Sequence, residues 1–111
     1  MSTQPDAVRL QHIRDAAQRA TEFCAGRTRK DLDTDDMLRL ALTKLVEIIG
    51  EAAKHIGPET RRRFPDVPWS DAARTRDRLV HHYFDIDLDV LWATVSSDLP
   101  QLLKGLGNEK D

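Results

Sequence analysis

An arginine, a histidine and a tyrosine stand close together in the second half of this chain, in the run RDRLVHHY from Arg76 to Tyr83. A guanidinium can hold a phosphate through two parallel hydrogen bonds, and an imidazole can take up or release a proton near neutral pH. Arg76 and His81 together therefore indicate chemistry on a phosphodiester.

The elements that position this run are expected to be helical. The apolar pattern predicts a helix over 71–84 with Ser70 as its N-cap. At about 100° per residue, Arg76 lies near the centre of the apolar arc, and Tyr83 projects from nearly the same side. The other members of that arc are Trp69, Ala72, Ala73, Leu79, Val80 and Phe84. A charged side chain is thus predicted on the face that packs against the rest of the protein.

Three environments would suit a guanidinium on such a face, because an unpaired buried charge is too costly. Arg76 could form a structural salt bridge with Glu47 or Glu51, reach a cavity, or lie between subunits. His81 is about 140° from Arg76 on an ideal helix, so one subunit does not direct both groups to one point. Two such helices meeting across a twofold axis would bring both pairs into one cleft. This geometry favours a homodimer with a composite site, and the salt bridge stays open as the alternative.

The successive histidines His81 and His82 raise the possibility of a metal site. Neighbouring helix residues point about 100° apart, whereas chelation uses positions such as i and i+4. His81 with Asp77 or Asp85 would supply two ligands, but no further ligand motif follows, so we predict no metal and no cofactor. The same carboxylates offer a non-catalytic role for His81, as a helix histidine in an ion pair.

The composition describes a single intracellular domain. With 111 residues the chain can build one core but not two, so we expect one domain over 1–111. No apolar run approaches the roughly 18 residues of a membrane span, and the first residues lack the features of a signal peptide. The lone Cys24 can form no internal disulfide and is expected to pack as a small hydrophobe. These features predict a cytoplasmic protein.

The net charge of -2 excludes a basic coat for nucleic acid, so any contact with RNA must be local. Several arginines near the run are either a solvated face or contacts for an RNA backbone. They are Arg61, Arg62, Arg63, Arg74 and Arg78.

A helical period runs through the whole chain and predicts an all-α, antiparallel bundle of four to five helices, with no strands. The helices are expected over 7–25, 37–56, 71–84 and 88–103, with a short one begun by Pro58. Gly26 stops the first, the acidic cluster 31–36 caps the second, Asp87 caps the last, and Pro100 kinks or divides it. The second helix is predicted to be the centre of the core, through an apolar stripe that includes Met37, Leu38, Leu42, Leu45, Val46 and Ile49.

Four segments, taken in order, look like those of a known family. They are IGEAA at 49–53, FPDVPW at 64–69, the run from Arg76 to Tyr83 and YFDIDLDVLW at 83–92. The third matches the pattern RxxxxHxY. With these segments the chain resembles, over about 31–103, the HepT-like toxins, a branch of the HEPN superfamily of helical ribonucleases.

The resemblance implies a metal-independent endoribonuclease toxin, a homodimer that cleaves RNA such as tRNA or mRNA in a cleft between facing helices. It implies that Arg76 and His81 are the catalytic pair. It also implies a minimal nucleotidyltransferase as antitoxin, which transfers AMP to Tyr83. Supporting or RNA-contacting candidates are Asp77, where the superfamily often has Asn, and Arg78, Arg74, His82 and Glu51. The alternative is a helical dimer that binds a nucleotidyltransferase, RNA or a nucleotide without turnover.

Overall fold

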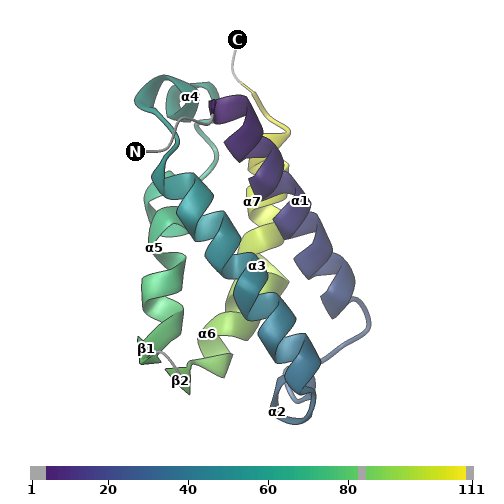
Figure 1. Cartoon of the computed structure of the whole chain (residues 1–111). Coiled ribbons are helices and arrows are strands. Elements are labelled where there is room, and N and C mark those ends of the chain that lie inside the picture. Colours follow the sequence, from purple (N-terminus) through teal and green to yellow (C-terminus); the bar gives the residue numbers. More distant parts are fainter. Residues whose placement is uncertain (1–4, 83–84, 110–111) are drawn as a thin grey trace.

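The computed structural model describes residues 5–82 and 85–109 and shows a bundle of antiparallel helices, which confirms the all-α prediction (Figure 1). The helices are α1 (Asp6–Cys24), α2 (Asp31–Thr34), α3 (Asp36–Lys54), α4 (Pro58–Arg63), α5 (Trp69–Leu79), α6 (Leu88–Ala93), a π-helical turn η1 (Thr94–Asp98) and α7 (Leu99–Leu106). Two short strands, β1 (Val80–His82) and β2 (Asp85–Ile86), form a hairpin at one end. None of the helices in these ranges is long and apolar enough to cross a membrane.

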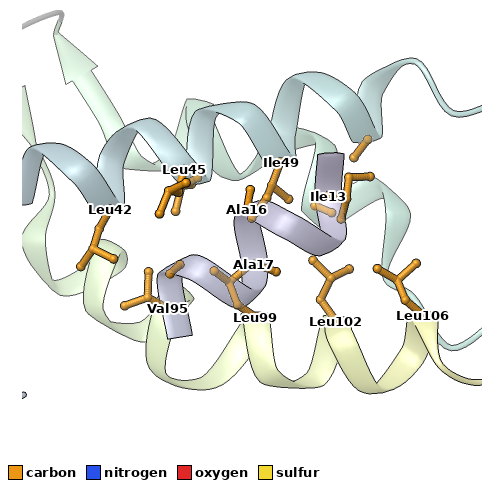
Figure 2. Packing of buried hydrophobic residues seen from close by; sticks show 14 of the residues in the cluster. Ile13, Ala16, Ala17, Leu42, Leu45, Ile49, Val95, Leu99, Leu102 and Leu106 are labelled. Carbon is orange, nitrogen blue, oxygen red and sulfur yellow. The ribbon is translucent and has the colours of Figure 1, made fainter. Parts of the chain in front are cut away.

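The core forms where α1 lies between α3 and the η1–α7 segment (Figure 2). The side chains that meet there are Ile13, Ala16 and Ala17 of α1, Leu42, Leu45 and Ile49 of α3, and Val95, Leu99, Leu102 and Leu106 of η1 and α7. Small side chains at Ala16 and Ala17 let α1 approach both neighbours closely. Since α3 also packs against α5, its predicted central place is confirmed. Met37 is the exception, because its side chain is 82% exposed.

Most of the predicted helix starts and stops are confirmed. Gly26, with φ 73°, follows the end of α1 in the left-handed region that glycine adopts without strain. The Asp35 carboxylate accepts a hydrogen bond from the Leu38 amide at 3.0 Å and caps α3. Asp87 caps α6 in the same way, and Pro58 opens α4.

The last helix is divided just before Pro100, as the sequence predicts. Proline has no backbone N–H to donate to the preceding turn. The π-helical turn η1, which is wider than an α-helix, ends at Asp98, and α7 begins with Leu99 and Pro100. The Thr94 and Ser96 hydroxyls donate to carbonyls four residues earlier, at 2.8 and 2.6 Å. Such bonds compete with the helical ladder and bend helices, which favours a break at this place.

The start of α5 differs from the prediction, because Ser70 lies inside the helix and Pro68 takes the N-cap position. The buried Trp69 anchors this start, since its indole N–H donates to the Phe64 carbonyl at 3.1 Å. The packing of the indole thus sets the first residue of α5, and it outweighs the preference of serine for the N-cap position.

The end of α5 also differs: the helix stops at Leu79 instead of about Phe84, and the prediction of no strands is wrong. Val80 pairs with Ile86 in an antiparallel hairpin, and the pairing continues from His82 to Asp85. Val80 is β-branched, which favours extended backbone over helix. Over so short a run, apolar periodicity does not distinguish the two states.

Two helix glycines give a matched test of this packing. A Cβ on Gly105 would lie 3.1 Å from the Asp66 carbonyl oxygen and from Val67 Cγ2, whereas one on Gly50 would lie 3.6 Å from the Ala72 carbonyl oxygen, an ordinary contact. We expect Gly105→Ala to lower the free energy of unfolding by about 1–3 kcal/mol through overpacking. Gly50→Ala should raise it by up to about 1 kcal/mol through helix propensity. Urea unfolding of both variants measures this, and a shift of the same sign in both would contradict the packing.

Candidate functional site

Arg76 lies on α5 with its side chain 54% exposed. Its position differs from the prediction, because it is beside the buried face of α5 instead of at its centre. That face consists of Trp69, Ala72, Thr75 and Leu79. The threonine takes the place expected for the arginine, since its hydroxyl donates to the Asp71 carbonyl at 2.9 Å and so can be buried at little cost.

The predicted salt bridge from Arg76 to Glu47 or Glu51 is not formed among the described residues. The Glu51 carboxylate instead lies 3.1 Å from the Nε2 atom of His55, and the Nη1 atom of Arg76 lies 3.9 Å from Asp77. Of the three environments considered for Arg76, the structure supports a cavity. Because the guanidinium is solvated, no burial penalty requires a second subunit to cover it.

Two adjoining hollows open beside Arg76. The first, called here the α1–α3–α5 hollow, has a volume of about 460 Å³ and is lined by Arg9, His12, Lys44, Glu47, Ile48, Glu51, Ala52, His55 and Arg76. The second, the α3–hairpin groove, has a volume of about 480 Å³ and is lined by Arg39, Leu40, Thr43, Lys44, Glu47, Arg76, Val80 and Ile86. Lys44, Glu47 and Arg76 belong to both linings, so a chain-like ligand could pass from one hollow to the other over Arg76.

Arg9, at the edge of the first hollow, is engaged by a carboxylate of its own helix. The Asp6 carboxylate lies 2.9 Å from Arg9 and also accepts hydrogen bonds from the Thr60 hydroxyl at 2.7 Å and the Gly57 amide at 3.1 Å. The bond from Thr60 is the main cause that holds the pKa of Asp6 below its ordinary value, followed by those from Gly57 and Arg9. Asp6 therefore stays anionic, fixes Arg9 and ties α1 to α4.

Lys44 and Arg76 are the cations of these hollows best placed to meet an external anion. Arg39 is already paired with Asp36 of its own helix. Lys44, by contrast, is exposed and makes neither a hydrogen bond nor an ion pair with any part of the chain that the structure describes. Phosphates placed against Arg76 and Lys44 would replace weak or absent internal contacts, so binding them breaks no strong ion pair.

His81 lies in β1, beyond the end of α5, so the angle of about 140° that an ideal helix would give between it and Arg76 does not apply. That angle therefore no longer gives a reason to expect a second helix at the site. The Val80 amide donates to the Arg76 carbonyl, and Val80 pairs with Ile86. The strand that carries His81 is thus tied by its backbone to the turn that carries Arg76. Tyr83 lies outside the described residues.

The other predicted arginines do not join this site. Arg74 is paired with Asp71 at 3.7 Å, and an Arg78 nitrogen lies 3.5 Å from the Thr75 hydroxyl. Arg78 lines a separate pocket of about 280 Å³ between α3, α5 and the η1–α7 segment. Of the supporting candidates whose side chains the structure describes, Asp77 and Glu51 lie beside Arg76; the side chain of His82 is outside that set.

Sequence reasoning missed several lining residues, among them His12, Lys44 and His55. The signal for the last two was a polar stripe of Lys44, Glu47, Glu51 and His55, spaced at three and four residues along α3 and its C-cap. No comparable signal existed for His12, which comes from a different helix.

Cys24 takes no part in the site. It is half-buried against the core, and this burial raises the pKa of its thiol, as expected for a packed hydrophobe. Among the side chains that the structure describes, those of 5–80 and 85–109, no three His, Cys, Asp or Glu gather in a group that could hold a metal ion.

Comparison with known proteins gives a consistent set of matches. The family model described as "Ribonuclease HepT-like" matches residues 13–107. A Thermococcus cleftensis protein named "Probable ribonuclease HepT" is 40% identical over 93 residues, which cover 84% of each chain. A Methanocaldococcus jannaschii protein named as a "Putative RNase" is 36% identical over 95 residues, 86% of this chain and 87% of the relative. A Caldanaerobacter subterraneus protein with the same description is 35% identical over 95 residues, 86% and 85% of the two chains. No solved structure matches the chain significantly.

Proposed function

Because this chain belongs to the HepT-like ribonuclease family, we propose that it is a metal-independent endoribonuclease that acts as the toxin of a toxin–antitoxin pair. The observation that carries the proposal is the exposed Arg76 guanidinium at the junction of two hollows, on a helix turn bonded to the strand of His81. Such a group can meet a phosphate of a chain that runs through both hollows. The proposed domain spans 1–111 and acts in the cytoplasm on RNA, either tRNA or mRNA.

The proposed reaction is an internal transesterification of RNA. The ribose 2′-oxygen attacks the adjacent phosphorus, a new O–P bond forms, and the bond from phosphorus to the 5′-oxygen of the next nucleotide breaks. His81 takes the proton from the 2′-hydroxyl or delivers one to the leaving 5′-oxygen. Arg76 stabilises the negative charge that grows on the non-bridging oxygens. The products are a 2′,3′-cyclic phosphate and a 5′-hydroxyl.

The proposed working form is a homodimer with a composite site. Support comes from the first turns of α3, where Met37 is 82% and Leu40 is 67% exposed. Leu40 lines the α3–hairpin groove together with Arg76, and the half-buried Val80 and Ile86 extend its apolar surface. Exposed large apolar side chains beside a charged site are typical of a surface that a partner covers. A second copy packed there would place both active-site helices around one cleft.

The proposed control is AMP transfer to Tyr83 by a minimal nucleotidyltransferase antitoxin, as the family resemblance implies. The phenolic oxygen would attack the α-phosphorus of ATP and release pyrophosphate. AMP on Tyr83 would add a bulky anion close in sequence to Arg76, which would occupy or repel the phosphate site. One modification could then silence the enzyme.

The test is cleavage of mixed cellular RNA by the purified protein in the presence of EDTA. We expect cleavage at an unchanged rate with the chelator, because the arginine and histidine need no metal for this reaction, and fragments that end in 2′,3′-cyclic phosphates. Terminal analysis of the fragments distinguishes this chemistry from hydrolysis by an activated water. Cleavage that stops with EDTA, or fragments with 5′-phosphates, would contradict the proposed mechanism.

A second candidate is a helical dimer that binds a nucleotidyltransferase, RNA or a nucleotide without turnover. The contact of 3.9 Å between Asp77 and Arg76 favours it, because that carboxylate places a negative charge beside the proposed phosphate site. This candidate predicts RNA binding that depends strongly on salt and leaves the RNA intact.

A further inference from the structure

We propose that the α1–α3–α5 hollow is a subsite for the nucleotide next to the scissile phosphate, with Lys44 on its phosphate and His12 and His55 beside its base. This inference rests on the proposed function and extends it, since it states where the RNA chain continues on one side of Arg76. The three residues come from α1, from α3 and from the C-cap of α3, outside the run from Arg76 to Tyr83.

The place of Lys44 suits a phosphate contact. Its side chain lines both hollows, as does Arg76, so the two cations lie along one continuous path. A nucleic acid carries a charged phosphate at every nucleotide, so a second cation on the same path as Arg76 is available to a neighbouring phosphate. Lys44 is exposed and has no internal anion among the described residues, so it gives up no ion pair on binding.

The remaining lining of the hollow suits a base. His12 stands on α1, and His55 follows the end of α3, where the Glu51 carboxylate holds its ring at 3.1 Å. Imidazole rings are among the flat side chains on which unpaired RNA bases stack. The half-buried Ile48 and Ala52 supply an apolar floor. The volume of about 460 Å³ lies within the range of about 300–1,000 Å³ typical of small-molecule sites.

The charge of the hollow indicates one phosphate and a base, instead of a run of phosphates. Arg9, Lys44 and Arg76 contribute three positive charges, of which Asp6 already engages that of Arg9. Two carboxylates, Glu47 and Glu51, oppose them. A second phosphate would lie against carboxylates, whereas the neutral base of a nucleotide would not be repelled.

The experiment measures binding of a fluorescently labelled single-stranded RNA oligonucleotide of mixed sequence by fluorescence anisotropy. All proteins carry His81→Ala, so that the RNA stays intact. We expect Lys44→Ala to raise the dissociation constant about tenfold, as for a lost charged contact, and to reduce the slope of log K against log salt by about 0.7. Lys104→Ala is the matched control, because Lys104 is an exposed lysine of α7 that lines neither hollow, and it should change neither value.

The stacking role is tested in the same assay with two substitutions of His12. His12→Ala should raise the dissociation constant about tenfold, and His12→Phe should restore it, because phenylalanine keeps a flat ring for the base. The subsite is overturned if Lys44→Ala and His12→Ala bind RNA as tightly as Lys104→Ala, or if the parent protein binds no RNA. Cleavage by the chain with His81 intact is measured separately, so loss of turnover with retained subsite effects would contradict only the proposed function.

Discussion

Replacing Arg76 with alanine should lower the rate of RNA cleavage by about 10²- to 10³-fold, the usual cost of removing one group that stabilises transition-state charge. Replacing His81 with alanine should cost about 10²- to 10⁴-fold, the range for a general acid or base. Arg76 is 54% exposed and lies outside the buried face of α5, so its removal should leave the free energy of unfolding almost unchanged. A fall in rate without a fall in stability would therefore be caused by the loss of a catalytic group and not by unfolding.

Single-turnover cleavage of an RNA oligonucleotide measures both effects, and growth of bacteria that express each protein gives a second readout. Arg19→Ala is the control, because Arg19 is an exposed arginine of α1 that lines neither hollow beside Arg76. Wild type and Arg19→Ala should cleave RNA and arrest growth, whereas Arg76→Ala and His81→Ala should do neither. If the wild type is toxic and both active-site variants are equally toxic, the catalytic assignment is wrong.

Replacing Tyr83 with phenylalanine should abolish the proposed neutralisation by AMP transfer. Phenylalanine keeps the ring but lacks the hydroxyl oxygen that would attack the α-phosphorus of ATP, so the modification has no acceptor. On co-expression with the cognate nucleotidyltransferase, wild type should gain AMP and lose its toxicity. Tyr83→Phe should stay unmodified and arrest growth. In a growth assay with the nucleotidyltransferase, cells with wild type should therefore grow and cells with Tyr83→Phe should not.

Intact mass measurement of the purified proteins gives the number of AMP groups, and peptide mapping places them on the chain. A nucleotidyltransferase variant that cannot bind ATP is the control, since it separates AMP transfer from simple binding. An unmodified Tyr83 in a neutralised complex, or neutralisation of Tyr83→Phe by the nucleotidyltransferase, would contradict the proposed AMP transfer and indicate that the partner acts by covering the site.

The sequence by itself determined the local features of this protein. Gly26, Asp35 and Asp87 act on the backbone within one turn, so each helix boundary they set could be predicted from the residue type. The apolar stripe of α3 predicted the centre of the core, because a helix with so broad an apolar face must be covered on more than one side. The ordered segments around the run from Arg76 to Tyr83 were sufficient to predict the family to which the chain belongs.

The tertiary structure alone decided how the site is built. The hairpin that ends α5 at Leu79 forms through pairing of Val80 with Ile86, a contact that helical periodicity over so short a run cannot predict. The exposure of Arg76 depends on which face of α5 meets α3, and a rotation of less than half a turn separates a buried arginine from a solvated one. His12 and Lys44 line one hollow with Arg76 only because α1 and α5 both pack against α3. Such contacts between distant segments follow from the packing of the whole bundle, and no local pattern of residues records them.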